Sequence, residues 1–191
     1  MINLAVFASG SGSNAENLVL YFDKHPKIRV SLILSNKLDA FVLQRAKQLN
    51  IPTVVFNKDD FYHSDNVLKA LADYRIDRLV LAGFLWLIPD NLLKAFPQCI
   101  INIHPALLPR YGGRGMYGNH VHEAVIANDE KETGITIHLV DAEYDHGKIL
   151  FQIKCPVLPN DTPKTVAAKV HVLEHQYFPI VVEQWAVTGN L

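Results

Sequence analysis

Cysteine is scarce in this sequence, and long apolar runs are absent from it. Cys99 and Cys155 are the two cysteines among 191 residues, too few for a disulfide framework, so we expect reduced thiols in apolar surroundings. No run approaches the roughly 18 apolar residues that a membrane-spanning helix needs. Residues 1–7 lack the basic segment and the long apolar segment of a signal peptide. These absences predict a cytoplasmic protein without a membrane partner.

An excess of basic charge is also missing. Lys and Arg number 18 and Asp and Glu 19, for a net charge of -1 at pH 7. Nucleic acids are bound by basic patches, so this balance argues against a nucleic-acid partner. The length suits one full hydrophobic core and is short for two domains. The sequence contains no repeat and no linker, so it predicts a single domain over residues 1–191. A homodimer of such domains is possible.

Short apolar runs alternate with amphipathic stretches along the chain. This alternation is typical of β–α–β units in a mostly parallel sheet. We expect an α/β fold with a three-layer, Rossmann-like sheet, helices on both faces and an antiparallel C-terminal strand pair. Pro179 predicts a kink or a break in the last helix. The expected strands are 2–8, 28–34, 53–56, 78–82, 99–103, 135–140 and 149–155, and the expected helices are 13–24, 39–49, 64–74, 89–96, 120–127 and 163–186.

A glycine-rich segment, Gly10-Ser11-Gly12-Ser13-Asn14-Ala15, lies between the first expected strand and the first helix. Glycines there let backbone N–H groups approach a phosphate at the helix N-terminus. The segment also fits the dinucleotide pattern G-x-G-x-x-A, which expects an acidic residue at the end of the second strand. Ser35-Asn36 stand there instead. A monophosphate site is therefore favoured over NAD, and a ligand-free turn capped by Ser13 is the structural alternative.

The run Asn102-Ile103-His104-Pro105 closes an apolar strand, and Asp145 follows in the loop between the last two strands. Open α/β sheets bind their ligands at the carboxyl ends of strands. An Asn amide can hold a developing oxyanion, a His can carry a proton, and an Asp can fix the tautomer of that His and raise its pKa. Read singly, the three would be a strand cap, a solvated His and a turn residue. Together they favour acyl transfer.

Two further patterns each allow a functional and a structural interpretation. The stretch Ala82 to Pro89 is too apolar for an ordinary loop, and it suits either core packing or a slot for a flat ring. His171-Val172-Leu173-Glu174-His175 matches H-x-x-E-H, in which two His on one helix face can bind zinc. A polar helix stripe, or a Glu174 that faces a ligand, explains the same residues without a metal.

With these motifs in view, the sequence resembles the folate-dependent formyltransferases along nearly its whole length, and among them the phosphoribosylglycinamide formyltransferases. The N-I-H-P element with its later D-x-G is typical of the whole group. The S-N phosphate loop and the C-terminal Glu-His point to the glycinamide ribonucleotide members. The matching segments are Ser9 to Asn14, Leu81 to Phe84, Asn102 to Pro109, Gly134 to His138, Asp145 to Gly147 and Glu174-His175.

The resemblance implies transfer of the formyl group of 10-formyltetrahydrofolate, the co-substrate, to the amine of 5′-phosphoribosylglycinamide in purine biosynthesis. It implies direct attack by the amine, with no metal and no covalent intermediate. Its catalytic residues would be Asn102, His104 and Asp145. The ribonucleotide would be bound by Gly12, Ser13, Asn14 and Glu174. The folate would be bound by Leu85, Trp86, Leu87, Ile88, Asn102, Val140 and Asp141.

The sequence departs from the family where the folate tail would bind. The family often carries an Arg around 62–65, where this chain has Tyr62-His63-Ser64-Asp65, and an Arg where Trp86 stands. Arg114 in the glycine-rich loop is a candidate replacement. Three alternatives stay open: a hydrolase that passes the formyl group to water, a formyltransferase for another amine, and a non-catalytic nucleotide-binding module. The first has an extra N-terminal domain in known relatives, and the tRNA-specific transferase an extra C-terminal one.

Overall fold

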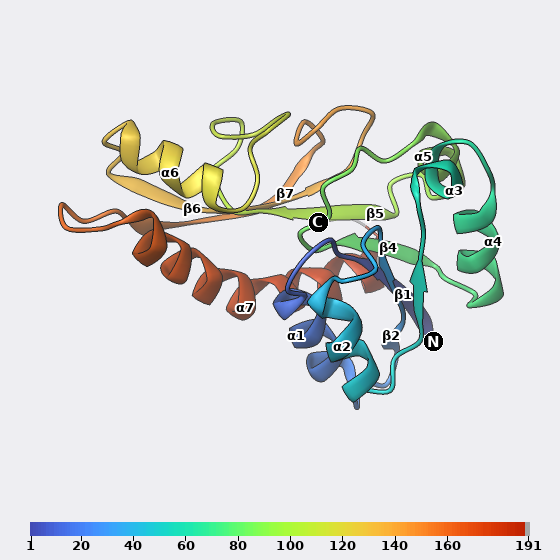
Figure 1. The fold of residues 1–191 in the computed structure, drawn as a ribbon. Coiled ribbons are helices and arrows are strands. Elements are labelled where there is room, and N and C mark those ends of the chain that lie inside the picture. Colours follow the sequence, from blue (N-terminus) through green and yellow to red (C-terminus); the bar gives the residue numbers. More distant parts are fainter. Residues whose placement is uncertain (190–191) are drawn as a thin grey trace.

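The computed structural model describes residues 1–189, and its seven strands form one sheet (Figure 1). The strand order is β3-β2-β1-β4-β5-β6-β7. Strands β1 to β5 are parallel to one another, β6 is antiparallel to β5, and β7 is antiparallel to β6. The predicted fold class is confirmed. The strands are β1 Ile2–Phe7, β2 Ile28–Ser35, β3 Thr53–Val55, β4 Arg78–Leu81, β5 Ile100–His104, β6 Glu132–Leu139 and β7 Ile149–Pro156.

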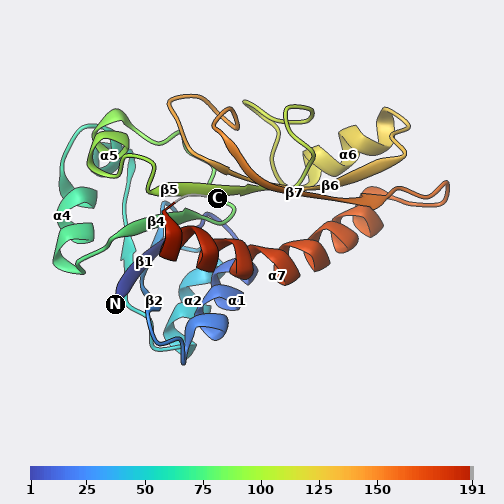
Figure 2. The ribbon, with the colours of Figure 1, turned by 180° about the vertical axis from the view of Figure 1, so that it is seen from behind.

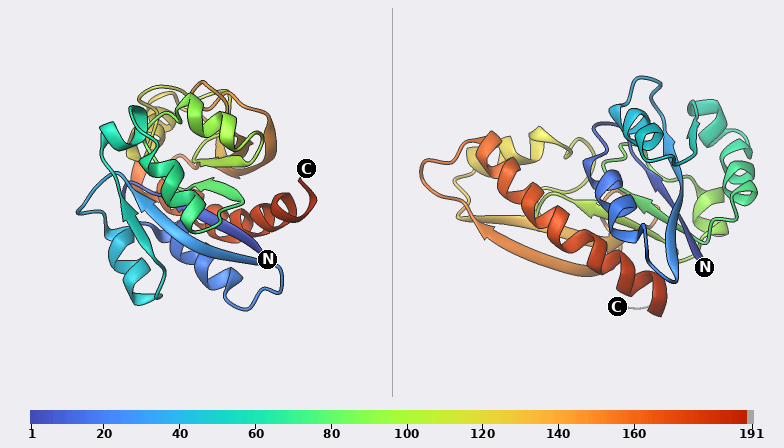
Figure 3. Two further views of the ribbon diagram at one scale, coloured as in Figure 1. Left: turned by 90° about the vertical axis from the view of Figure 1, so that its right-hand side faces the viewer. Right: turned by 90° about the horizontal axis from the view of Figure 1, so that it is seen from below.

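Helices cover both faces of the sheet (Figures 2 and 3). Alternate residues of β1 serve the two faces: Leu4 and Val6 belong to one buried cluster, and Ala5 and Phe7 to the other. The first cluster contains α1 Ser13–Phe22, α2 Phe41–Gln48 and α7 Pro163–Thr188. The second contains α3 Lys58–Tyr62, α4 Asn66–Asp73 and α5 Asp90–Ala95. Helix α6, Asn119–Ala127, contacts α7.

The position of the site follows from the strand order. After β1 the chain continues to β2 on one side, whereas β4 pairs with β1 on the other. The loops that leave β1 and β4 therefore diverge and open a crevice at the carboxyl ends of the strands, which is where open α/β sheets bind ligands. The N–H of Ser9 donates to Gly83 O at 3.0 Å, and the N–H of Leu85 donates to Ser9 Oγ at 3.2 Å. These bonds hold the two loops together at the crevice.

Two expectations about helices need correction. The helix expected over 64–74 is preceded by a separate short helix, α3, whose capping box joins Asn57 and Asp60. Of the kink or break expected at Pro179, the break is absent, because α7 is continuous from Pro163 to Thr188. Proline has no N–H and leaves the carbonyl four residues earlier without its helical donor. That carbonyl, His175 O, accepts instead from Asn17 Nδ2 of α1 at 2.9 Å.

The two cysteines are free, as predicted, and both are half-buried. The guanidinium of Arg78 donates to Cys99 Sγ at 3.4 Å. Burial raises the pKa of the Cys155 thiol, so that thiol is protonated and weakly reactive near neutral pH. Among the helices of residues 1–189, none combines the length and the apolar character that crossing a bilayer requires.

Candidate active site

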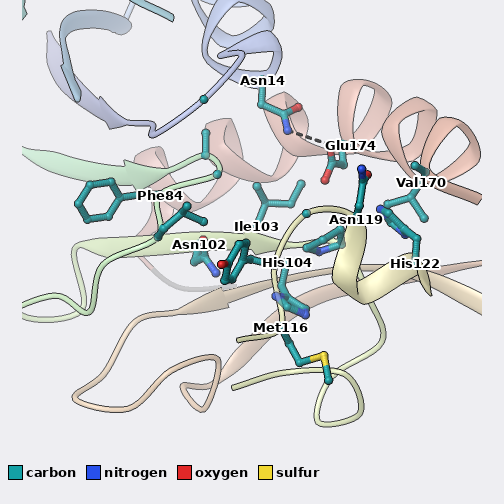
Figure 4. A pocket seen from close by; sticks show the side chains of 18 of the residues that line it. Asn14, Phe84, Asn102, Ile103, His104, Met116, Asn119, His122, Val170 and Glu174 are labelled. Atoms are coloured by element: carbon teal, nitrogen blue, oxygen red, sulfur yellow. Dashed lines mark hydrogen bonds between the residues drawn. The ribbon is translucent and has the colours of Figure 1, made fainter. Parts of the chain in front are cut away.

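A cavity of about 820 Å³ opens at the carboxyl ends of β1, β4 and β5 and is closed on its far side by α6 and α7. In Figure 4, Asn102 and His104 rise from β5 on one side, while Asn14 and Glu174 face them from the other. The cavity thus brings together both sets of residues that the sequence assigned to catalysis and to the ribonucleotide. The predicted catalytic and ribonucleotide-binding residues that line this cavity are Gly12, Ser13, Asn14, Asn102, His104, Asp145 and Glu174.

A smaller hollow of about 50 Å³ lies beside the main cavity. Five residues predicted for the folate line it: Trp86, Leu87, Ile88, Asn102 and Val140. Leu85 lines the main cavity instead. Asp141 lines neither; its carboxylate accepts from His146 Nδ1 at 2.9 Å. Phe84, Asn102, Tyr144 and Asp145 line both cavities, so two of the three predicted catalytic residues stand at the junction.

The tautomer of His104 is set by a backbone carbonyl. His104 Nε2 lies 2.7 Å from Tyr111 O, and a carbonyl can only accept, so Nε2 carries the hydrogen. The other nitrogen, Nδ1, lies 3.5 Å from Asp145 Oδ2. The expectation that Asp145 fixes the tautomer is therefore wrong, because Tyr111 O does so. Nδ1 is left as the atom that can take up and release a proton.

The pKa of His104 is lower than that of an ordinary histidine. Burial is the largest cause and lowers it, whereas the charge of Asp145 and the bond to Tyr111 raise it, and His138 lowers it slightly. Asp145 thus acts in the predicted direction, but the loss of hydration outweighs it for a side chain that is 3% exposed. The imidazole is consequently neutral near pH 7 before substrates bind, which makes Nδ1 a base.

Asp145 is held as a carboxylate by its neighbours. Burial by itself raises its pKa, but the contacts from His138, His104 and the Gly113 N–H outweigh burial and bring the pKa below the usual range. The N–H of Gly113 donates to Asp145 Oδ2 at 2.9 Å, and His138 Nε2 lies 3.6 Å from Asp145 Oδ1. The negative charge therefore persists at neutral pH, in contact with the Nδ1 side of His104.

The sequence interpretation missed His138, which completes the cluster. His138 is paired with Asn102 across β5 and β6. Its Nδ1 lies 2.8 Å from Leu139 O and must carry the hydrogen, so its Nε2 accepts from Asn102 Nδ2 at 3.1 Å. Asn102 Nδ2 also donates to Asp145 Oδ1 at 3.3 Å. The Asn102 amide must release one of these bonds to donate to an oxyanion, and the longer bond to Asp145 is the weaker one.

The glycine-rich loop from Gly10 to Asn14, which we call the phosphate loop after its predicted ligand, leads into α1 without a side-chain cap. Gly12 is the N-cap, with φ 71°, and no side chain caps the helix. Ser13 is the first helical residue, and its Oγ lies 3.0 Å from His171 Nε2 of α7. The side chain of Ser13 is thus directed to the cavity wall formed by α7, so the capped-turn alternative is wrong.

Asn14 and Glu174 join α1 to α7. Asn14 Nδ2 donates to Glu174 Oε2 at 2.9 Å (Figure 4). Burial raises the pKa of Glu174, and the bond from Asn14 lowers it only in part. A carboxyl with a raised pKa in a polar cavity is suited to hydroxyl or amine groups of a ligand.

The H-x-x-E-H pattern has a structural explanation. The rings of His171 and His175 contact each other with centroids 4.1 Å apart and planes tilted by 46°. Glu174 points to Asn14 instead of to these rings. Within residues 1–189, no three His, Cys, Asp or Glu side chains converge as metal ligands would. His171 contacts the phosphate loop through Ser13 and lines the main cavity, whereas His175 does not line it.

Acid should destabilise the fold. Burial is the largest cause that lowers the pKa of His104, His122 and His175. The pKa of each His is about 6.5 in the unfolded chain. Between that pH and the lowered pKa, the unfolded chain binds more protons than the folded one, so the free energy of unfolding falls as the pH drops through this window. The urea midpoint of unfolding should be highest at pH 7.5, lower at pH 6.5 and lowest at pH 5.5. His122→Gln should make this midpoint depend less on pH. A constant midpoint would contradict this expectation.

The comparisons with known proteins identify the family to which this Rossmann-like sheet belongs. The sequence profile of the formyl transferase family matches residues 2–182. The chain therefore belongs to the formyl transferase family. The relatives that it resembles are phosphoribosylglycinamide formyltransferases, in sequence and in structure alike.

Three of these relatives show how far the likeness extends. The chloroplastic phosphoribosylglycinamide formyltransferase of Arabidopsis thaliana is 42% identical over 94% of this chain and 63% of its own. That of Haemophilus influenzae is 35% identical over 100% of this chain and 90% of its own. The crystal structure of phosphoribosylglycinamide formyltransferase from Anaplasma phagocytophilum matches with a TM-score of 0.89 and 31% identity. The match covers 98% of this chain and 87% of that one. The chain spans about three fifths of the length of the plant relatives.

Proposed function

We propose that this protein transfers the formyl group of 10-formyltetrahydrofolate to the amine of 5′-phosphoribosylglycinamide. The observation that carries the proposal is the shared cavity: the phosphate loop at Gly12 to Asn14 and the cluster of Asn102, His104 and Asp145 open into one space. A ribonucleotide bound by its phosphate at the loop would extend along that space to the cluster. The family supports a formyl group as the group transferred.

The donor would enter from the side of the smaller hollow. Its apolar wall of Trp86, Leu87, Ile88 and Val140 suits the flat pterin ring of a folate. Asn102 and Asp145 line both cavities, so a formyl group presented there would meet the amine beside them. Glu174 would face the ribonucleotide. Asp141 lines neither cavity, so the geometry gives its predicted contact with the donor no support.

The reaction needs one bond to form, one to break and one proton to move. The amine nitrogen attacks the formyl carbon, the bond from that carbon to N10 of the folate breaks, and a proton passes from the amine to N10. Asn102 Nδ2 would stabilise the negative oxygen of the intermediate, and the imidazole of His104 would add to this once its Nδ1 has taken up a proton. The free Nδ1 of His104, next to the charge of Asp145, would take up the proton and return it.

The same family site could pass the formyl group to water, so water is the competing acceptor. Supplying 10-formyltetrahydrofolate with and without the ribonucleotide, and following tetrahydrofolate release, separates the two reactions. We expect release that depends on the ribonucleotide, with the formylated ribonucleotide as product. Equal release without it would sink the transferase proposal. We further propose that the domain, residues 1–191, acts in the cytoplasm on small molecules alone, as a monomer or a homodimer.

A further inference from the structure

Three consecutive carbonyls of the phosphate loop are bonded on the side away from the cavity. Gly10 O accepts from the N–H of Val42 at 3.1 Å, and Gly12 O accepts from the N–H of Glu16 at 2.9 Å. Between them, Ser11 O accepts from Arg45 Nε at 2.9 Å. Two of these donors belong to α2 and one to α1, so the loop is anchored to two helices through its oxygens.

The anchored carbonyls fix the direction of the loop's donors. In a trans peptide the C=O of one residue and the N–H of the next point in opposite directions. With the oxygens of Gly10, Ser11 and Gly12 held by the helices, the N–H groups of Ser11, Gly12 and Ser13 are turned away from those helices. Within the described chain none of these three N–H groups donates a hydrogen bond. All three residues line the main cavity, where such N–H groups form a nest for an anion.

Arg45 is the one side chain among the three anchors. Val42 and Glu16 donate from their backbones, which a substitution leaves in place. The guanidinium of Arg45 is held by an ion pair with Glu16 and lies over the ring of Phe41, 5.0 Å from its centroid. Because Glu16 neutralises its charge locally, the contribution of Arg45 to the loop is the hydrogen bond to Ser11 O more than a long-range field.

We propose that Arg45 is a positioning residue for the phosphate of the acceptor: by holding Ser11 O, it keeps the Gly12 N–H aimed into the cavity. This inference rests on the proposed function for the identity of the acceptor, though its geometry concerns any phosphate monoester at this loop. Arg45 itself lies behind the loop and does not contact the ligand.

Two substitutions separate the hydrogen bond from the charge. In Arg45→Gln, the side-chain Nε2 follows the same three carbons as Arg Nε and can donate to Ser11 O without a charge. In Arg45→Met, a methyl group takes that place and nothing donates. We expect Arg45→Met to raise the KM for the ribonucleotide about tenfold, the scale of one hydrogen bond from a charged group. Arg45→Gln should stay within about threefold because its bond is neutral. In both variants, the kcat and the KM for the formyl donor should equal those of the wild type.

A substrate without phosphate tests where the effect acts. Dephosphorylated glycinamide riboside should react poorly with every form, and Arg45→Met should not weaken it further. An equal rise of the KM for the ribonucleotide in Arg45→Met and Arg45→Gln would assign the effect to charge and overturn the proposal. An unchanged KM in Arg45→Met would also overturn it, as would an equal weakening by Arg45→Met with the riboside. Thermal unfolding of both variants should match the wild type within a few degrees, and a large decrease with a fallen kcat would indicate a general structural role.

Binding of inorganic phosphate, measured by calorimetry, keeps this inference separate from the proposed function. If the wild type transfers no formyl group but binds phosphate, and Arg45→Met binds it about tenfold more weakly while Arg45→Gln does not, the positioning role holds and the function fails. If transfer occurs but phosphate and ribonucleotide bind the three forms equally, the function holds and the positioning role fails. If the wild type neither transfers nor binds phosphate, both fail.

Discussion

The Asp145→Asn variant is expected to fold normally and to lose at least about 100-fold in kcat, the range of a positioned acid–base group. Asparagine has nearly the same size but no charge. The variant keeps an acceptor for the Gly113 N–H, which preserves the loop. It removes the negative charge 3.5 Å from His104 Nδ1, where the proposed reaction places a proton. Because Asp145 is the largest of the causes that raise the pKa of His104, its loss lowers that pKa further and makes the imidazole a still weaker base.

Steady-state kinetics with both substrates tests this expectation. The two KM values should change little, because the lost interaction strengthens only when charge develops. Glu132→Gln is the matched control: Glu132 is an exposed carboxylate paired with Lys154 at 2.7 Å on β6 and β7, and its loss should leave kcat unchanged. Turnover of Asp145→Asn near that of the wild type would remove Asp145 from the mechanism.

The fold was largely predictable because it depends on local periodicity. The alternation of Leu4 to Phe7 between two cores, and the apolar runs of the parallel strands, are visible along the chain. The break expected at Pro179 failed for a reason that periodicity does not contain. The carbonyl of His175 finds its donor in Asn17, which is 158 positions away in the sequence. The sequence contains the capping box of α3, Asn57 with Asp60, but a helix of five residues is too short to show an amphipathic periodicity.

The candidate site was predictable only in part, because its energetics arise from pairing across strands. Asn102, His104 and Asp145 could be named from residue type and position at strand ends. The role of His138 depends on the register that sets it opposite Asn102, and the hold of Arg45 on Ser11 depends on how α2 packs against the loop. The direction of the pKa of His104 required the burial of that side chain, which the tripeptide Asn102-Ile103-His104 does not reveal.

The second large effect is expected from Gly12→Ala, which should unfold at lower denaturant and bind the ribonucleotide poorly. Gly12 has φ 71°, a region that costs alanine about 1 kcal/mol or more. A Cβ at this position would also collide with the side chain of Val42 and lie 2.8 Å from Val42 Cα. Overpacking against a helix backbone costs about 1–3 kcal/mol. Together these terms predict a loss of about 2–4 kcal/mol in the free energy of unfolding.

Gly83→Ala separates the two causes. Gly83 has φ 73°, nearly the same as Gly12, but a Cβ there meets no atom within 4 Å. It should therefore lose only the conformational part, about 1 kcal/mol. The difference between the two variants in urea unfolding measures the contact with Val42. Because that contact pushes α2 away from the loop whose carbonyls α2 anchors, Gly12→Ala should also raise the KM for the ribonucleotide about tenfold or more, beyond the loss of the Arg45 bond alone. Equal unfolding midpoints in the two variants would show that the loop yields freely, and that α2 does not hold it in place.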